Sequence, residues 1–162
     1  MLTDYVRLMD GNLRKNGITT ALGPEFYVKA MQHLSVALEE FGNAADRLQH
    51  YVGAIHSGEK GVTIRQLEQL NSRIQLLERA FISEQGIYPE RSFYRHVVFA
   101  ASEMNDYGGV TFALIMDPVQ KWLQATSESE RQHWLETVKL GFTRLQYAIE
   151  SATLTIKFEY GY

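Results

Sequence analysis

The scarcity of proline is the feature that most restricts the fold of this chain, which has only three prolines in 162 residues. Between Pro24, Pro89 and Pro118 the sequence carries helix-forming residues, with apolar side chains recurring every three or four positions. This spacing is typical of one face of a helix. A narrow apolar face must be buried against another helix, so we expect an all-α protein.

The clearest helix begins near Pro24 and continues for about eight turns. Proline suits the first turn, because an N–H there would have no partner within the helix. Gly58 and Gly61 predict its end. Its apolar residues alternate in steps of four and three, as in a seam between packed helices: Tyr27, Met31, Leu34, Leu38, Phe41, Ala45, Leu48, Val52 and Ile55.

Two further helices begin with capping boxes, in which a Ser or Thr and a Glu or Gln three residues later bond each other's backbone amides. Thr63 and Gln66 begin the first helix, which we expect to end before Gly86. Ser127 and Glu130 begin the second. The apolar seams are Ile64, Leu67, Leu70, Ile74, Leu77 and Phe81 in the first, and Leu135, Val138, Phe142, Leu145, Ile149, Ala152 and Ile156 in the second.

These helices and a shorter one over residues 2–13 predict an up-and-down, four-helix-type bundle in a single domain. One irregular excursion, around residues 87–117, interrupts the helical pattern with a β-branched and aromatic run followed by glycines. Connections that long inside a domain are usually functional. We expect the seam of the bundle, and of any dimer, to include Leu34, Leu38, Phe41, Leu48, Phe142, Leu145 and Ile149.

Composition excludes several classes of function. The chain has 16 basic and 19 acidic residues, so it lacks the positive charge that nucleic-acid binding requires. It has no cysteine, no pair of histidines four residues apart and no nucleophile elbow, so we expect no catalytic residue, metal or cofactor in this chain. The longest apolar run, residues 112–116, is far too short to span a bilayer, so we expect a soluble segment without membrane contact.

The order and spacing of several motifs resemble the transferrin-receptor-like dimerisation domain, the C-terminal domain of the glutamate carboxypeptidase II and transferrin receptor family. Asn105 and Tyr107, followed by Phe112 and Asp117, place the chain nearer the peptidase branch than the receptor branch. The motifs are Leu76–Ile82 (LLERAFI), Phe93–Ala100 (FYRHVVFA) and Asn105–Gly109 (NDYGG).

The resemblance implies that residues 1–162 are one domain excised from a longer protein, with a zinc peptidase domain upstream that would hold the metal. It implies homodimerisation through the bundle and contact with that peptidase domain. The parent protein would be anchored in a membrane, with this domain on the extracellular or lumenal side. The alternative is a free-standing intracellular helical adaptor that binds a partner helix.

By resemblance, Asn105, Asp106 and Tyr107 line the substrate pocket of the peptidase domain. In the glutamate-releasing peptidases a lysine stands at the position of Asp106 and a tyrosine at that of Tyr107, and together they hold the carboxylates of a C-terminal glutamate. Tyr107 matches this pattern, whereas the carboxylate of Asp106 would repel such a substrate. The parent would therefore cleave other peptides, or none.

The neighbouring Arg95 and His96 invite a catalytic interpretation, but the pattern around them favours a structural one. Residues 93–99 alternate in a way that predicts an extended segment, with Phe93 and Arg95 on one face and His96 on the other. We expect this segment to lie between the bundle and a neighbouring domain. Arg95 would then hold a carboxylate or backbone carbonyls.

Overall fold

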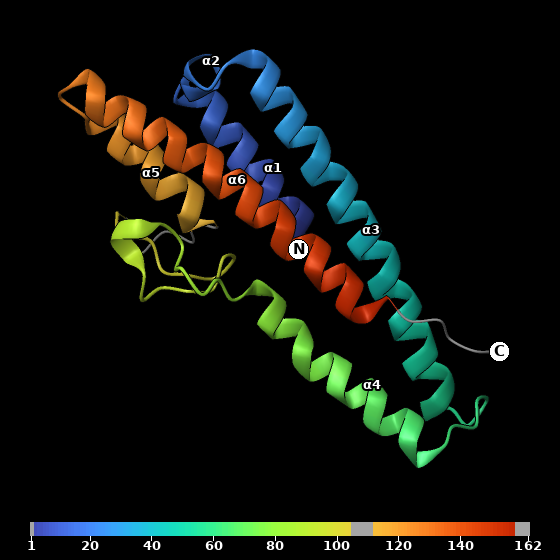
Figure 1. Cartoon of the computed structure of the whole chain (residues 1–162). Coiled ribbons are helices and arrows are strands. Elements are labelled where there is room, and N and C mark those ends of the chain that lie inside the picture. Colours follow the sequence, from blue (N-terminus) through green and yellow to red (C-terminus); the bar gives the residue numbers. More distant parts are fainter. Residues whose placement is uncertain (1, 105–111, 158–162) are drawn as a thin grey trace.

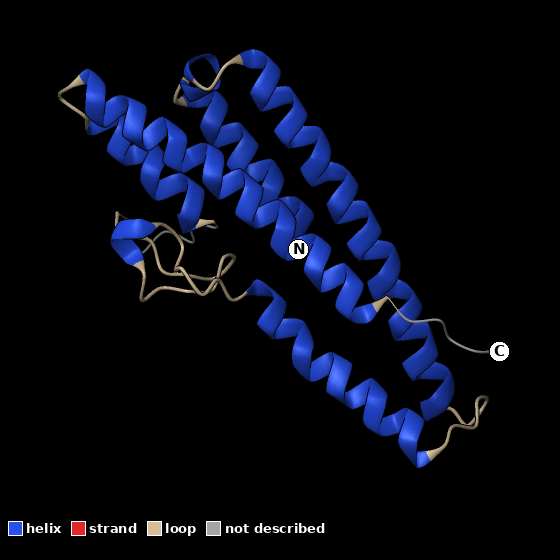
Figure 2. Ribbon diagram, viewed as in Figure 1, coloured by secondary structure: helices blue, strands red, loops and turns tan. Residues whose placement is uncertain are grey.

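The computed structural model describes residues 2–104 and 112–157, and helices dominate this part of the chain (Figure 2), as an all-α helical bundle requires. Short 3-10 turns, η1 (Glu78–Phe81) and η2 (Pro89–Arg91), lie in the connection between the fourth and fifth helices. The helices are α1 (Leu2–Lys15), α2 (Ile18–Ala21), α3 (Pro24–His56), α4 (Ile64–Leu77), α5 (Ala113–Gln124) and α6 (Glu128–Ile156).

The helix starts follow the predicted capping chemistry. Pro24 occupies the first turn of α3. Both capping boxes are present, with the Thr63 side chain accepting from the Gln66 amide in α4 and the Ser127 side chain accepting from the Glu130 amide in α6. Local sequence therefore determines where the long helices begin.

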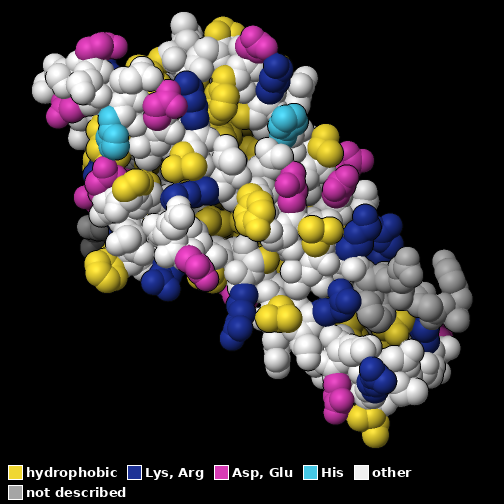
Figure 3. Space-filling view, viewed as in Figure 1, with side chains coloured by type: hydrophobic (Ala, Val, Ile, Leu, Met, Phe, Trp, Pro, Cys, Tyr) yellow, Lys and Arg dark blue, Asp and Glu magenta, His cyan; other side chains and the backbone are white. Residues whose placement is uncertain are grey.

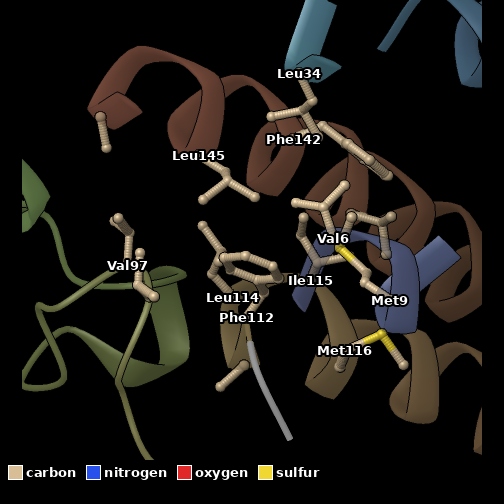
Figure 4. Close-up of a cluster of buried hydrophobic side chains, with 14 of the residues drawn as sticks. Val6, Met9, Leu34, Val97, Phe112, Leu114, Ile115, Met116, Phe142 and Leu145 are labelled. Atoms are coloured by element: carbon tan, nitrogen blue, oxygen red, sulfur yellow. The ribbon is translucent and has the colours of Figure 1, made fainter. Parts of the chain in front are cut away.

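The hydrophobic core lies where α1, α3, α5 and α6 meet (Figure 4). Met9, Leu34, Leu114 and Leu145 bring one side chain from each of these helices, and none is more than 1% exposed. Phe142 packs edge-on against the rings of Phe26 and Tyr27, with ring centroids 6.1 and 6.4 Å away. Burying a large apolar side chain stabilises a fold by about 1.5–3 kcal/mol, so this junction is the main source of stability.

The predicted seam is buried at five of its seven positions and half-buried at the other two, Phe41 and Leu48. The buried residues of the second half of α3 are Ala44 and Tyr51 rather than Ala45 and Val52. The reason is that a straight helix has 3.6 residues per turn, so a repeat of seven drifts around its surface. The five buried members are Leu34, Leu38, Phe142, Leu145 and Ile149.

The expected end of the excursion at residue 117 is wrong, because α5 begins at Ala113 and contains Pro118. Proline has no N–H, so the Leu114 carbonyl has no donor one turn later. α6 approaches this carbonyl closely at Gly141, where a Cβ atom would lie only 2.7 Å from the Leu114 oxygen. A proline in one helix and a glycine in the other thus bring α5 and α6 together.

The expectation that residues 63–81 form a full member of the bundle also needs correction. In Figure 1 α4 and α5 lie toward opposite ends of the molecule, with the irregular segment between them. Leu70 is the single buried residue of α4, whereas Ile64 is 77% exposed. α5 packs along the first part of α6 instead, and α4 lies near the last part.

Gly86 does not terminate a helix, as was expected, since α4 ends at Leu77. It has a φ of +78° in the connection after η1, and a Cβ atom there would lie 2.6 Å from the Arg91 carbonyl oxygen. Glycine is therefore required by both the backbone angle and the close approach of η2. Among the described residues, no helix combines the length and apolar character needed to cross a membrane.

Candidate functional site

A buried carboxylate organises the irregular segment at the first turns of α5. Asp117 is 1% exposed and accepts hydrogen bonds from the Ser102 hydroxyl (2.5 Å), the Glu103 amide (2.8 Å) and the Arg91 guanidinium (3.2 Å). Arg91 also donates to the Ala101 carbonyl at 2.6 Å. These contacts tie both η2 and residues 101–103 to α5.

A second group of polar side chains completes this Asp117 cluster. The Tyr88 hydroxyl donates to Glu103 Oε2 at 3.0 Å, and Lys121 Nζ lies 2.9 Å from the same oxygen. Hydrogen bonds from Lys121 and Tyr88 lower the pKa of Glu103. Burial, together with the charge of Asp117, raises the pKa of Tyr88 well above its usual range. The cluster thus holds Glu103 as a carboxylate and Tyr88 as a neutral phenol.

The cluster and α5 hold the chain on both sides of the segment that was predicted to line a substrate pocket. Before it, residues 102–104 are bonded to Asp117 or to Ser102. After it, Phe112 is fully buried and has a φ of +62°. Asn105, Asp106 and Tyr107 lie outside the described residues, so their role remains a prediction.

An exposed aromatic patch, formed by Phe93, Tyr94 and Phe99, covers the outside of the same segment. Phe93 is 93% exposed, and Tyr94 and Phe99 are about half exposed. Arg91 lies over the Tyr94 ring at 3.6 Å from its centroid and so fixes the orientation of that ring. Aromatic side chains displayed in this way are typical of a surface that contacts another protein.

The predicted alternation along residues 93–99 is not observed. Val97 and Val98 are adjacent in sequence and both buried, whereas Phe93 and Arg95 are exposed. The chain makes isolated bonds to residues 81–87, including a bridge between Ile82 and His96, and then turns where the Ala100 amide donates to the His96 carbonyl. A turn places consecutive side chains on the same side, which a strand cannot do.

His96 is part of this turn and has a structural role. Its Nδ1 accepts hydrogen bonds from the Val98 and Phe99 amides, so its Nε2 carries the proton and donates to Glu78 at 3.0 Å. The ring also stacks on Phe81, with centroids 5.9 Å apart. Both ring nitrogens of this imidazole are engaged in hydrogen bonds that hold the loop.

Two arginines that the sequence analysis did not single out, Arg91 and Arg144, hold this segment within the described chain. The side chain of Arg95 is exposed and has no hydrogen bond to any described residue. Arg91 holds Asp117 and a carbonyl, and Arg144 of α6 donates to the Gly86 and Ile87 carbonyls at 3.1 Å each. A sequence signal existed for the cluster, since Asp117 directly follows the apolar run of residues 112–116.

The arrangement does not offer chemistry at Asp117, because Arg91, the Ser102 hydroxyl and the Glu103 amide engage the carboxylate. Within residues 2–104 and 112–157, no group of three or more potential metal-ligating side chains comes together. The site can fix a loop and present an aromatic surface.

Comparison with known proteins identifies a family and a relative. The sequence model of the transferrin receptor-like dimerisation domain matches residues 27–157, from the first turn of α3 to the end of α6. The probable glutamate carboxypeptidase LAMP1 of Arabidopsis thaliana is 28% identical over 123 residues. The matched region is 76% of this chain but only 16% of that relative, so the chain spans a small part of its length.

Proposed function

The chain belongs to the family of transferrin receptor-like dimerisation domains, and on that premise we propose that it is the homodimerisation domain of a glutamate carboxypeptidase-like protein. The family match over residues 27–157 carries this proposal, because it covers the helical framework from α3 to α6. The likeness to a probable glutamate carboxypeptidase supports the peptidase branch. In this proposal the chain supplies assembly, and a separate domain of the longer protein supplies zinc and catalysis.

The aromatic patch would contact the peptidase domain of the same protein. Phe93 is the most exposed large apolar residue of the described chain. Val97 and Val98 of the same segment are buried, and the His96 side chain accepts hydrogen bonds from the Val98 and Phe99 amides. A preformed apolar surface loses little conformational freedom on binding, which favours a permanent contact between domains.

The segment that follows the Asp117 cluster would line the substrate pocket of that peptidase domain. Asn105 and Tyr107 would face the substrate, whereas the carboxylate of Asp106 would disfavour a C-terminal glutamate or aspartate. In the full-length protein, Asp106→Lys should therefore raise kcat/KM for peptides ending in glutamate relative to peptides ending in a neutral residue. An unchanged ratio would contradict this part of the proposal.

Sedimentation velocity from about 1 to 50 µM tests the central claim. We expect a reversible dimer whose dissociation constant changes little between 0.05 and 0.5 M salt, because burial of apolar surface is less sensitive to salt than surface ion pairing. A chain that stays monomeric at 50 µM would contradict homodimerisation by this domain alone. Binding of an amphipathic helix by such a monomer would support the adaptor alternative.

A further inference from the structure

The outward surface of α6 changes character along its length. From residue 128 to 139 every exposed position is polar or charged, as expected for a helix that faces water. From residue 140 to 156 the exposed positions are Leu140, Thr143, Tyr147, Glu150 and Leu154. Tyr147 is 71% and Leu154 69% exposed. The second half of α6 therefore presents large apolar side chains to solvent with a single charged residue among them.

These apolar residues form a straight stripe, here called the α6 outer stripe: Leu140, Tyr147 and Leu154. They are spaced by seven residues, so they lie on one side of the helix. The buried residues Leu145, Ile149 and Ile156 lie on the opposite side, toward the core. A helix with apolar residues on two opposite sides is typical of one that lies between two layers.

Neighbouring elements extend the stripe into a broader surface. Tyr147 lines a hollow of about 410 Å³ together with Ile82 and Ala80, and Leu76 lines an adjoining groove of α4 together with Ser151 and Thr155. Figure 3 shows hydrophobic side chains along α6 and between α6 and α4, with Lys and Arg side chains around them. The stripe alone is about 21 Å long, so a partner helix of about four turns could lie along it.

We propose that the α6 outer stripe is the two-fold contact between two copies of this chain; the proposal rests on the homodimerisation function proposed above. Leu140 and Leu154 each lie seven residues from Tyr147. When two α6 helices cross antiparallel about an axis at Tyr147, Leu140 therefore lies opposite Leu154 of the second copy. This self-complementarity is what a two-fold contact requires.

The charges beside the stripe agree with the same axis. Glu150 lies three residues after Tyr147 and Thr143 four residues before it, so both lie on the same flank of the stripe and the rotation brings Glu150 beside Thr143 of the second copy. Arg144 lies on the other flank and donates to the Gly86 and Ile87 carbonyls of its own chain. The one carboxylate on this face would therefore meet a hydroxyl, and it would lie about 9 Å along the helix from the same carboxylate of the second copy.

The other long helix offers no comparable surface. Val28, Val36 and Val52 are exposed on α3, but the exposed positions between them are all polar or charged. They are Lys29, Gln32, His33, Ser35, Glu39, Glu40, Asn43, Asp46, Arg47, Gln49 and His50. Val36 is therefore a matched control position, because it is an exposed apolar residue on a long helix outside the proposed contact.

Sedimentation velocity of the wild type, Tyr147→Glu, Leu154→Glu and Val36→Glu tests the proposal. We expect the α6 variants to raise the dissociation constant of the dimer at least 30-fold, the change that marks a central interface residue. Val36→Glu should change this dissociation constant less than threefold. Circular dichroism must show unchanged helicity, as expected for exposed positions. A wild type that dimerises while both α6 variants dimerise equally well overturns the assigned surface but leaves homodimerisation intact. A monomeric wild type overturns both.

Disulfide trapping provides an independent measurement, because the chain has no native cysteine. Tyr147→Cys places one thiol beside the proposed axis, where it meets its own copy within disulfide distance. We expect covalent dimers under mild oxidation at a concentration at which Val36→Cys gives none. Equal trapping at both positions, or trapping at Val36 alone, would overturn the assignment.

Discussion

Both ends of the bundle are built from amphipathic helices, yet the apolar faces of these helices are buried to different extents. At one end α1, α3, α5 and α6 surround side chains such as Leu34 and Leu145, which are almost completely buried. At the other end α4 buries only Leu70. An apolar face is buried only where enough neighbours surround it, so periodicity alone does not show that a residue is in the core.

The surface of α6 follows the same division. Along the four-helix end its exposed residues are polar, and toward α4 they become Leu140, Tyr147 and Leu154. The sparsely packed end of the chain is thus also the end with an apolar outer surface. In our proposal a second copy of the chain packs against this apolar outer surface of α6.

The largest expected effect comes from breaking the cluster that ties the irregular segment to α5. Asp117→Ala leaves the 10%-exposed Arg91 side chain without its carboxylate, and it removes acceptors for Ser102 and Glu103. Loss of one partner of a buried ion pair costs about 3–5 kcal/mol, which urea denaturation would measure. The exposed Asp46→Ala on α3 is the control and should change the stability by less than about 0.5 kcal/mol.

Truncating one residue at each end compares the two ends directly. Leu145→Ala should lower the free energy of unfolding by about 2–5 kcal/mol, because it opens a cavity in the four-helix core. Ile74→Ala changes a position in α4 that is 43% exposed. It should lower the free energy of unfolding by well under half of the loss caused by Leu145→Ala. The measurements should be made at a concentration where the chain is monomeric. Equal losses for the two variants would contradict the contrast between the ends.

The two capping boxes allow a finer comparison, because they are chemically alike and lie at different ends. Ser127→Ala and Thr63→Ala should each cost about 1 kcal/mol locally. In α6 this loss should reduce the global stability, since that helix packs against α3 and α5. In α4 it should appear as faster hydrogen exchange of residues 64–70 with little change in the melting temperature. Identical behaviour of both variants would mean that α4 unfolds together with the core.

The smallest effect is an alkaline loss of stability at the irregular segment. Burial, together with the negative charge of Asp117, raises the pKa of Tyr88 above its ordinary value of 10.0. Above pH 10 the unfolded chain therefore releases this proton while the folded chain retains it. Stability should thus fall as the pH rises, by up to about 1.4 kcal/mol per pH unit for one such group. Tyr88→Phe should flatten this slope, whereas an unchanged slope would contradict the assignment.

Parts of the fold that depend on neighbouring residues were predictable from the sequence. The Thr63 and Ser127 capping boxes and the first-turn Pro24 are local signals, and the structure confirms all three. The end of the excursion was misplaced, because Pro118 normally interrupts a helix but here lies within α5. The alternation of residues 93–99 wrongly predicted an extended segment. The His96 side chain instead stabilises a turn, because it accepts hydrogen bonds from two backbone amides.

The sequence by itself determined that the chain is helical, where its long helices begin and to which family it belongs, because these properties depend on residues close together or on ordered motifs. Only the tertiary structure decided that Asp117 accepts hydrogen bonds from three donors and that Arg91 and Arg144 hold the loop. It also decided that one apolar stripe of α6 is buried while the opposite one faces outward. Two such stripes follow similar periods along the chain, and only the placement of the other helices around α6 distinguishes them.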